Sequence, residues 1–371
     1  MDCSVGNLIA DQNLVDVEPH ARGREHAHDE QEHRLGTLQQ GCTSRNLLNS
    51  VRTIRLMLQL FGKKPWMRQR LTVSAAIGLG SGLYCWFLMC HLHQGAGDFG
   101  WALRLAQRLL AGQNLYDTPF EQYPLTAAFF ALPFVRLQPE VAAGFFWGIS
   151  SFLLAFGLTR HGYRRLLIFL AYPYWAGILF AQWSPIIAAA ALFPLLLPVT
   201  MAKPQIGLPI LLTYLNRRGL IACVLLAILS LIVKPSWPLL WIRQFGHYEH
   251  FIPLMILPGP LLLLALLRGR DRDARLLLLA AAMPQRWFFD AFTLWLIPKT
   301  GRELLWTVLI SWGAGIWRQY QFPHSFNQVG RWAVIFLYLP MLAVVLLRKR
   351  GPYDPAKPPN SSAHAANSGV E

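Results

Sequence analysis

Carboxylates are scarce in this chain, so the ones that could do acid–base chemistry can be found by elimination. Eight of the 19 acidic residues lie in the first fifty positions and two lie in the polar tail after Gly351, which leaves nine. Asp271 and Asp273 lie inside an Arg cluster and are expected to be paired surface charges. Three of the other seven fall in one short stretch: Asp98, Asp117 and Glu121. This stretch is where we expect any carboxylate chemistry, and Asp98 is its sharpest candidate.

Asp98 also has a purely structural interpretation. It opens an amphipathic segment, and Asp is a preferred N-cap residue whose charge suits the positive end of a helix dipole. A capping Asp can still react with a substrate, so the two roles do not exclude each other.

Five further polar residues interrupt or flank apolar segments, where ionisable groups are costly and usually face a cavity. Lys203 and Lys234 each precede a proline, so a broken helix could present them to an anionic phosphate. Snorkelling to the membrane interface is the alternative for both. Gln182 is either a loop residue or a hydrogen-bonding ligand for a polar substrate. Arg286 and Asp290 could pair across one helical turn or line the same cavity.

Motifs of several enzyme classes are missing from the sequence. It has no Gly-rich nucleotide loop, no CxxC pair and no nucleophile elbow. His91 and His93 are two residues apart, which places them on different faces of a helix, so we expect interfacial histidines rather than metal ligands. The five cysteines form no pairing framework and are predicted to be free thiols. We therefore assign no metal ligand and no cofactor; the carboxylates of the stretch around Asp98 could hold a divalent metal, but no ligand cluster demands one.

The composition indicates that transmembrane helices position these residues. Hydrophobic residues make up 54% of the chain and charged residues 14%, whereas an ordinary soluble domain has about a quarter charged residues. The apolar residues come in runs: Leu71–Leu92, Val141–Leu158, Ser184–Val199, Gly219–Val233, Phe251–Leu267 and Val329–Leu347. Several runs have the roughly 17–25 residues that a helix needs to cross a bilayer. We therefore predict an all-α, polytopic transmembrane bundle of about 9–11 crossings, some of them Pro-broken or re-entrant.

Basic residues cluster at the ends of the apolar runs, which accounts for the formal charge of +15. Such clusters orient a membrane protein with its basic loops in the cytoplasm, so we expect a lipid bilayer and no nucleic acid as partner. The cluster before Leu71 predicts a cytoplasmic N-terminus and an external loop over roughly His93–Tyr123. The crossing parity stays open, because simple alternation places both His161–Arg165 and Arg348–Arg350 outside.

The external loop is predicted to contain an amphipathic helix over Asp98–Ala111. Trp101, Leu105 and Leu109 repeat at four-residue spacing, and such a helix should lie in the membrane interface rather than cross it.

Composition divides the chain into three regions. Residues 1–69 are predicted to be a disordered, basic cytoplasmic region and residues 351–371 a disordered tail, because neither has enough apolar residues to bury a core. Residues 70–350 should form a single membrane domain.

Four sequence segments follow one another between residues 98 and 212. They are DFGWALRLAQRLLAGQNLYD from Asp98, QYPLTAAFFALPFVRLQP from Gln122, FAQWSP from Phe180 and AKPQIGLPILL from Ala202. In this order they resemble glycosyltransferase family 87 of the type C superfamily of membrane glycosyltransferases. The family typically shows an Asp, a G-x-x-x-Y helix end, Y-P-P-L, G-Q, and K-P-Q before an Arg-rich turn. Leu125 replaces the second Pro of Y-P-P-L here, and Ala181 replaces the Gly of G-Q.

The resemblance implies transfer of a hexose, often mannose, from a polyprenyl-phosphate carrier to a hydroxyl of a lipid or glycan acceptor. Transfer would occur on the extracytoplasmic face of the cell membrane and invert the anomeric centre, with Asp98 as general base. Cations near the membrane surface would stabilise the lipid phosphate as it leaves. The residues expected to bind substrate are Tyr116, Tyr123, Gln182, Lys203, Gln205, Lys234, Arg286 and Asp290.

Two other functions stay open. The stretch from Gln182 to Lys203 is shorter than the resemblance leads us to expect, which favours a non-catalytic relative that binds lipid-linked glycans. Broken helices with Lys at membrane depth also suit a secondary transporter, although no internal repeat is visible.

Overall fold

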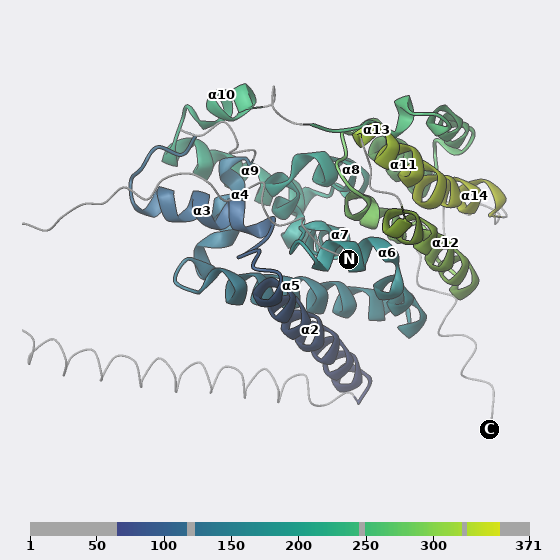
Figure 1. The fold of residues 1–371 in the computed structure, drawn as a ribbon, viewed down its shortest axis with the longest axis horizontal. Helices are drawn as coiled ribbons and strands as arrows, with labels where there is room; N and C mark the ends of the chain where they lie inside the picture. Colours follow the sequence, from purple (N-terminus) through teal and green to yellow (C-terminus); the bar gives the residue numbers. More distant parts are fainter. Residues whose placement is uncertain (1–64, 117–122, 245–248, 321–324, 349–371) are drawn as a thin grey trace, which may run out of the picture. The chain divides into compact units, whose positions relative to one another are not determined.

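The computed structural model describes residues 65–116, 123–244, 249–320 and 325–348. Predictions about Asp117, Glu121 and both terminal tails lie outside these residues. The chain divides into two units, Met1–Arg68 and Gln69–Glu371, and the account below concerns the second. Throughout the described ranges the regular elements are helices (Figure 1).

Three helical segments are long and apolar enough to cross a membrane. The first two are α2, Pro65–His91, and α5, Pro139–Leu158. The third, Phe326–Leu347, consists of α13 (Phe326–Ala333), a π-helical turn η9 (Val334–Tyr338) and α14 (Leu339–Leu347). These segments support the prediction of a helical membrane protein, and each coincides with a predicted apolar run.

Prolines divide much of the remaining chain into short helices. The elements between α5 and α12 (Gly301–Tyr320) include 3₁₀ helices, labelled η. In order they are η2 Thr159–His161, η3 Tyr163–Leu170, α6 Tyr172–Ile178, α7 Ser184–Ala190, η4 Pro194–Ala202, α8 Pro204–Tyr214, α9 Arg217–Val233, α10 Trp237–Ile242, η6 Pro253–Met255, η7 Gly259–Arg268, α11 Arg272–Ala282 and η8 Phe288–Leu296.

The apolar run Ser184–Val199 shows how a proline sets these boundaries. It forms two helices rather than one: α7 ends at Ala190, and η4 begins at Pro194. A proline ring clashes with the carbonyl of the residue four positions earlier and cannot donate the helical hydrogen bond. For Pro194 that earlier residue is Ala190, which is where α7 stops.

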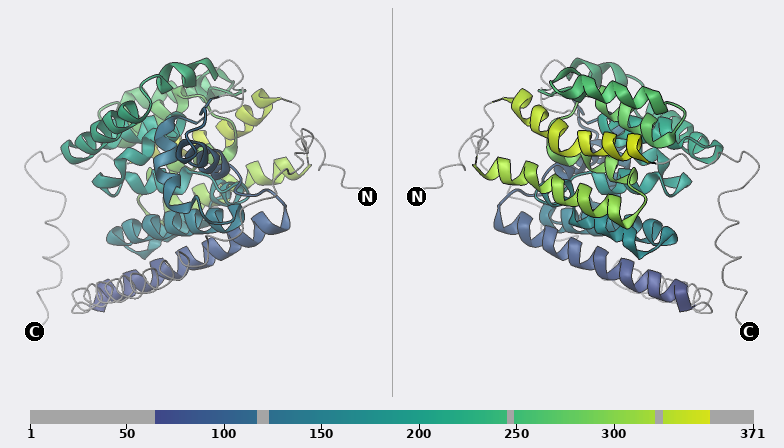
Figure 2. Two further views of the ribbon diagram at one scale, coloured as in Figure 1. Left: turned by 90° about the vertical axis from the view of Figure 1, so that its left-hand side faces the viewer. Right: turned by 90° about the vertical axis from the view of Figure 1, so that its right-hand side faces the viewer.

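Two helices that could span a membrane, α2 and α5, meet through glycines. Gly78 and Gly82 of α2 face Gly144 and Gly148 of α5, and a Cβ atom at Gly82 would lie only 2.8 Å from the carbonyl oxygen of Gly144. Figure 2 shows α2, in purple, running alongside α5 in both views. Small residues at four-residue spacing allow helix backbones to approach this closely.

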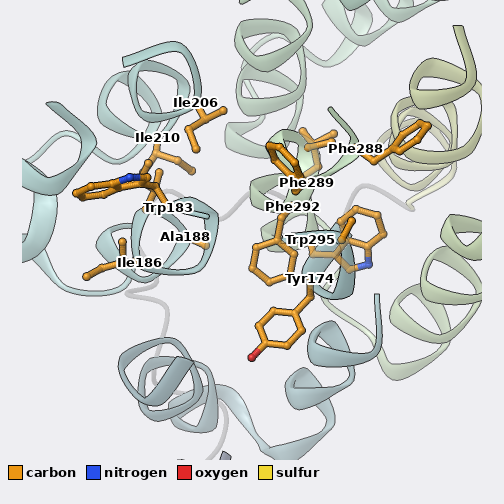
Figure 3. Close-up of a cluster of buried hydrophobic side chains, with 14 of the residues drawn as sticks. Tyr174, Trp183, Ile186, Ala188, Ile206, Ile210, Phe288, Phe289, Phe292 and Trp295 are labelled. Atoms are coloured by element: carbon orange, nitrogen blue, oxygen red, sulfur yellow. The ribbon is translucent and has the colours of Figure 1, made fainter. Parts of the chain in front are cut away.

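Aromatic side chains fill the core between α5, α6 and η8 (Figure 3). The ring of Tyr174 in α6 lies 5.6 Å from that of Phe292 in η8 and 5.2 Å from that of Trp147 in α5. The Tyr174 hydroxyl donates to Ser81 of α2 at 2.8 Å. This hydroxyl therefore ties the glycine-mediated helix pair to the aromatic core.

An ionic network joins the ends of α11, α12 and α14. Asp273 accepts from Lys299 at 2.9 Å and from Arg348 at 2.6 Å, and Arg348 also contacts Glu303 at 3.0 Å. Asp273 is only 3% exposed. The expectation of a surface charge was therefore wrong for Asp273, because its partners come from distant segments rather than from the Arg cluster around it.

Candidate functional site

Asp98 lies in the short connection between α2 and α3 (Phe99–Leu110). Its backbone N–H donates to the carbonyl of Phe180 at 2.7 Å. Gly97 has a φ of +55°, and a Cβ atom there would lie 2.6 Å from the same carbonyl oxygen. A glycine before Asp98 thus lets the chain turn directly against the segment that carries Gln182.

The side chain of Asp98 does not cap α3. Instead its Oδ2 accepts a hydrogen bond from the Tyr123 hydroxyl and another, at 2.9 Å, from the ammonium of Lys203. The capping interpretation therefore fails, and the carboxylate is directed to residues far away in the sequence.

Helix α3 is amphipathic, as predicted, and its apolar side packs against α4 (Leu125–Ala131) and α5. Phe99 and Leu105 are fully buried, and the Phe99 ring stacks on Phe146 at 4.1 Å. The guanidinium of the exposed Arg104 lies 4.3 Å from the ring centre of Trp101, which is partly buried against the core. Placement of α3 in a membrane interface stays a prediction.

Lys203 is the centre of the cluster. Its Nζ donates to Gln182 Oε1 at 2.6 Å and lies 3.5 Å from Asp290 Oδ1, in addition to its contact with Asp98. Lys203 is 6% exposed, so it does not snorkel to a surface. Because Pro204 follows, Lys203 is kept out of the helical conformation, and its side chain enters the protein at the start of α8.

Asp290 anchors Lys203 from the opposite side. Its Oδ2 accepts the backbone N–H groups of Arg286 at 2.9 Å and Trp287 at 3.4 Å. The predicted proximity of Arg286 and Asp290 is thus present, with the bond made by the Arg286 backbone. Asp290 is 1% exposed, and a buried carboxylate is tolerated only when it is paired and hydrogen-bonded in this way.

The two tyrosines are buried rather than open for stacking. Tyr116 is 9% exposed and Tyr123 is 7% exposed. The Tyr116 hydroxyl donates to the Tyr123 carbonyl at 3.2 Å, and the Tyr123 hydroxyl in turn reaches Asp98. Their positions favour orientation of the Asp98 carboxylate over contact with a sugar face.

Two predicted residues lie at helix ends. Gln205 is half-buried in the first turn of α8, two residues after Lys203. Lys234 caps the C-terminus of α9 through its backbone N–H, which donates to Ser230 at 3.1 Å. Within the ranges that the structure covers, Lys234 makes no contact with Asp98, Gln182 or Asp290, so the cluster forms without it.

One feature of the site could not be found from residue types. Ala181 adopts a φ of +45°, a left-handed conformation that glycine enters without strain. This is the position where the family motif carries Gly. The turn lies directly before Gln182, whose side chain accepts a hydrogen bond from Lys203.

The chemistry open to the cluster follows from its charges and exposure. The Asp98 side chain is 19% exposed, whereas those of Lys203 and Asp290 are 7% and 0% exposed. The most accessible group is therefore a carboxylate with an ammonium directly behind it, which suits proton acceptance beside an anionic group. Across the described ranges, no three His, Cys, Asp or Glu side chains are grouped to hold a metal ion.

Comparison with protein-family models, curated proteins and solved structures gave no match for this chain.

Proposed function

We propose that this protein transfers a hexose, with mannose as the first choice, from a polyprenyl-phosphate carrier to an acceptor hydroxyl. One observation carries the proposal. The four segments that resemble glycosyltransferase family 87 contribute Asp98, Tyr123, Gln182 and Lys203, and these four side chains form one hydrogen-bonded cluster. The fold brings these four residues together although they are spread over more than a hundred positions of the sequence.

In the proposed reaction Asp98 accepts the proton of the acceptor hydroxyl. The hydroxyl oxygen bonds to the anomeric carbon from the face opposite the carrier, so the configuration inverts. As the bond from the anomeric carbon to the phosphate oxygen breaks, that oxygen keeps the electron pair and the lipid phosphate leaves. Lys203 stabilises this anion, which requires its ammonium to turn from Asp98 toward the phosphate.

The proposed sidedness rests on the basic residues. Helices α2 and α5 place Asp98 at one end, and Arg70, which donates to the Phe156 carbonyl at 2.7 Å, at the other. The positive-inside rule favours a cytoplasmic location for the Arg70 end and an extracytoplasmic one for Asp98. The bundle would cross the membrane about 9–11 times, as the apolar runs suggest.

A non-catalytic role in binding lipid-linked glycans is the second candidate. Tyr123 and Lys203 both hold the Asp98 carboxylate. A carboxylate held by a hydroxyl and a buried ammonium can also serve only to order the site.

The test is sugar transfer by the purified full-length protein, with radiolabelled polyprenyl-phosphate mannose and glucose as donors. Asp98→Asn keeps the size of the side chain but cannot accept the proton, so transfer should fall about 10²–10⁴-fold. Glu140→Gln changes a half-buried carboxylate at the start of α5, near the same end of the bundle, and should stay close to wild type.

The outcomes separate the two candidates. Full transfer activity in Asp98→Asn would contradict the role of Asp98. Donor lipid that copurifies with the wild type without being turned over would favour the non-catalytic binder.

A further inference from the structure

A polar cavity lies at the end of α5 away from Asp98. It has a volume of about 370 Å³. Its lining consists of Gly157, Arg160, Arg165, Ala191, Leu192, Tyr214, Arg272, Leu296 and Lys299. Among these described residues there are four cations and no carboxylate.

The cavity is well separated from Asp98. A Cβ atom at Gly95, close to Asp98, would lie 3.8 Å from Pro139 at the start of α5, whereas Gly157 and Arg160 lie at its end. The 20 residues of α5 span ~30 Å, about the thickness of the hydrocarbon layer. The cavity therefore belongs to the opposite face of the membrane domain from the Asp98 cluster.

Arg165 makes this cavity unlike a surface patch of basic residues. Its side chain is 9% exposed, and its Nη2 reaches the Leu296 carbonyl only at 3.4 Å. Its Nε is buried and has no hydrogen-bond partner within the described chain. Buried N–H groups are nearly always paired, so an unused guanidinium N–H in a cavity wall points to a ligand.

The charges around Arg165 leave positive charge uncompensated. Burial lowers the pKa of the Arg165 guanidinium, and the nearby charge of Asp273 offsets this only in part. Burial likewise lowers the pKa of Lys299, although Asp273 hydrogen-bonds to it. Asp273 is already shared between Lys299 and Arg348. An anion in the cavity would supply the missing negative charge.

The remaining cations are held in place by aromatic rings. The Arg160 guanidinium lies 5.2 Å from the ring centre of Phe193, and that of Arg272 lies 5.4 Å from the ring centre of Tyr214. Stacked guanidinium groups are partly ordered before a ligand arrives, which reduces the entropy lost on binding.

We propose that this cavity binds a phosphate group, carried either by an anionic membrane lipid or by a soluble phosphate ester. The planar N–H fork of arginine matches two phosphate oxygens, and three arginines line the cavity. Basic pockets between helices on the cytoplasmic side are suited to lipid head groups. The proposal does not depend on the function proposed for the Asp98 cluster.

The test uses the full-length protein in nanodiscs of neutral phosphatidylcholine. In one arm phosphatidylglycerol is titrated into the bilayer, and retained lipid is counted by native mass spectrometry. In the other arm inorganic phosphate is titrated against chloride at equal ionic strength, and binding is followed by the thermal unfolding midpoint. Both arms compare the wild type with Arg165→Gln, Arg160→Gln and Arg164→Gln. Arg164 is the matched control, because it is exposed and does not line the cavity.

We expect the wild type to bind phosphatidylglycerol or phosphate selectively. This binding should be weakened at least about tenfold in Arg165→Gln and Arg160→Gln but not in Arg164→Gln. Phosphatidylglycerol alone would identify a lipid site, and phosphate alone a soluble ligand. Arg160 is exposed, so its variant keeps the test valid if Arg165→Gln does not fold. Absence of selectivity in both arms, or an equal loss in Arg164→Gln, would overturn the proposal.

Discussion

Gly97 controls where Asp98 lies, and its backbone makes a sharp prediction. Its φ is +55°, and a methyl group there would lie 2.6 Å from the carbonyl oxygen of Phe180. Gly97→Ala should therefore lower the thermal unfolding midpoint of the purified protein, by the equivalent of about 2 kcal/mol or more, because strain and a backbone clash add.

Gly112→Ala separates these two causes. Gly112 has a φ of +64° but nothing within 4 Å of the added Cβ. This variant should show only the backbone strain, about 1–2 kcal/mol. Equal losses in the two variants would mean that contact with Phe180 does not matter.

Residue types predicted part of the site. The scarcity of carboxylates pointed to Asp98, and the position of a lysine before a proline pointed to Lys203. The structure shows these two side chains in contact. The remaining contacts depend on tertiary structure that residue types do not reveal. Tyr123 was expected to bind substrate, but its hydroxyl donates a hydrogen bond to Asp98, and the backbone N–H of Asp98 donates to the Phe180 carbonyl. Lys203 and Lys234 share the same Lys-Pro pattern, and only packing distinguishes them.

At the scale of elements, the contact between α2 and α5 depends on close approach of two backbones. Gly82→Ala would place a methyl group 2.8 Å from the Gly144 carbonyl oxygen and 3.1 Å from the Gly148 Cα. The helices would have to move apart, at a cost of about 1–3 kcal/mol.

Gly80→Ala is the matched control in the same helix, because nothing lies within 4 Å of the added Cβ. Alanine is the better helix former, so this variant should be as stable as the wild type or up to about 1 kcal/mol more stable. Thermal unfolding of both variants in one detergent checks the pair. A stable Gly82→Ala protein would argue against a tight interface.

Hydropathy alone predicted two of the long helices, α2 and α5, but not α12, which is as long as α5 and lies in none of the apolar runs named above. Helices α2 and α5 lie within a few residues of the runs Leu71–Leu92 and Val141–Leu158. It failed to predict the boundaries inside Phe251–Leu267, where η6 and η7 replace a single helix. Apolar runs indicate burial in lipid or protein, whereas prolines decide where hydrogen bonding along the chain stops.

At the scale of the whole membrane domain, Arg348 holds together elements that are distant in sequence. It donates to Asp273 at the start of α11, to Glu303 in α12 and, at 2.8 Å, to the carbonyl of Ile297. Arg348→Met would leave Asp273, 3% exposed, with Lys299 as its one ionic partner among the residues that the structure describes. Removing one member of a buried ion pair costs about 3–5 kcal/mol.

The control for Arg348→Met is Arg275→Met, which removes an exposed Arg from α11. Its effect should stay within about 0.5 kcal/mol. The measurement is the urea or thermal midpoint in detergent. Similar midpoints for the two variants would show that the network does not hold the helix ends together.

Acid should weaken the same network through Glu303. Burial raises the pKa of Glu303, but hydrogen bonds from Arg348 and from the backbone amides of Lys299 and Thr300 outweigh it, so the pKa lies below its ordinary value. A carboxylate whose pKa is lower in the folded state stabilises the fold above its unfolded pKa, about 4.3, and this contribution disappears as the pH falls through the folded pKa. Glu303→Gln should therefore lower the thermal midpoint at pH 7, and the difference in midpoint between this variant and the wild type should shrink as the pH falls below about 4.

The control is Glu140→Gln, which removes a carboxylate that has no ion pair among the described residues. The difference in midpoint between this control and the wild type should not change in this way with pH. A gap between wild type and Glu303→Gln that stays constant down to acid pH would mean that the Glu303–Arg348 contact does not stabilise the fold.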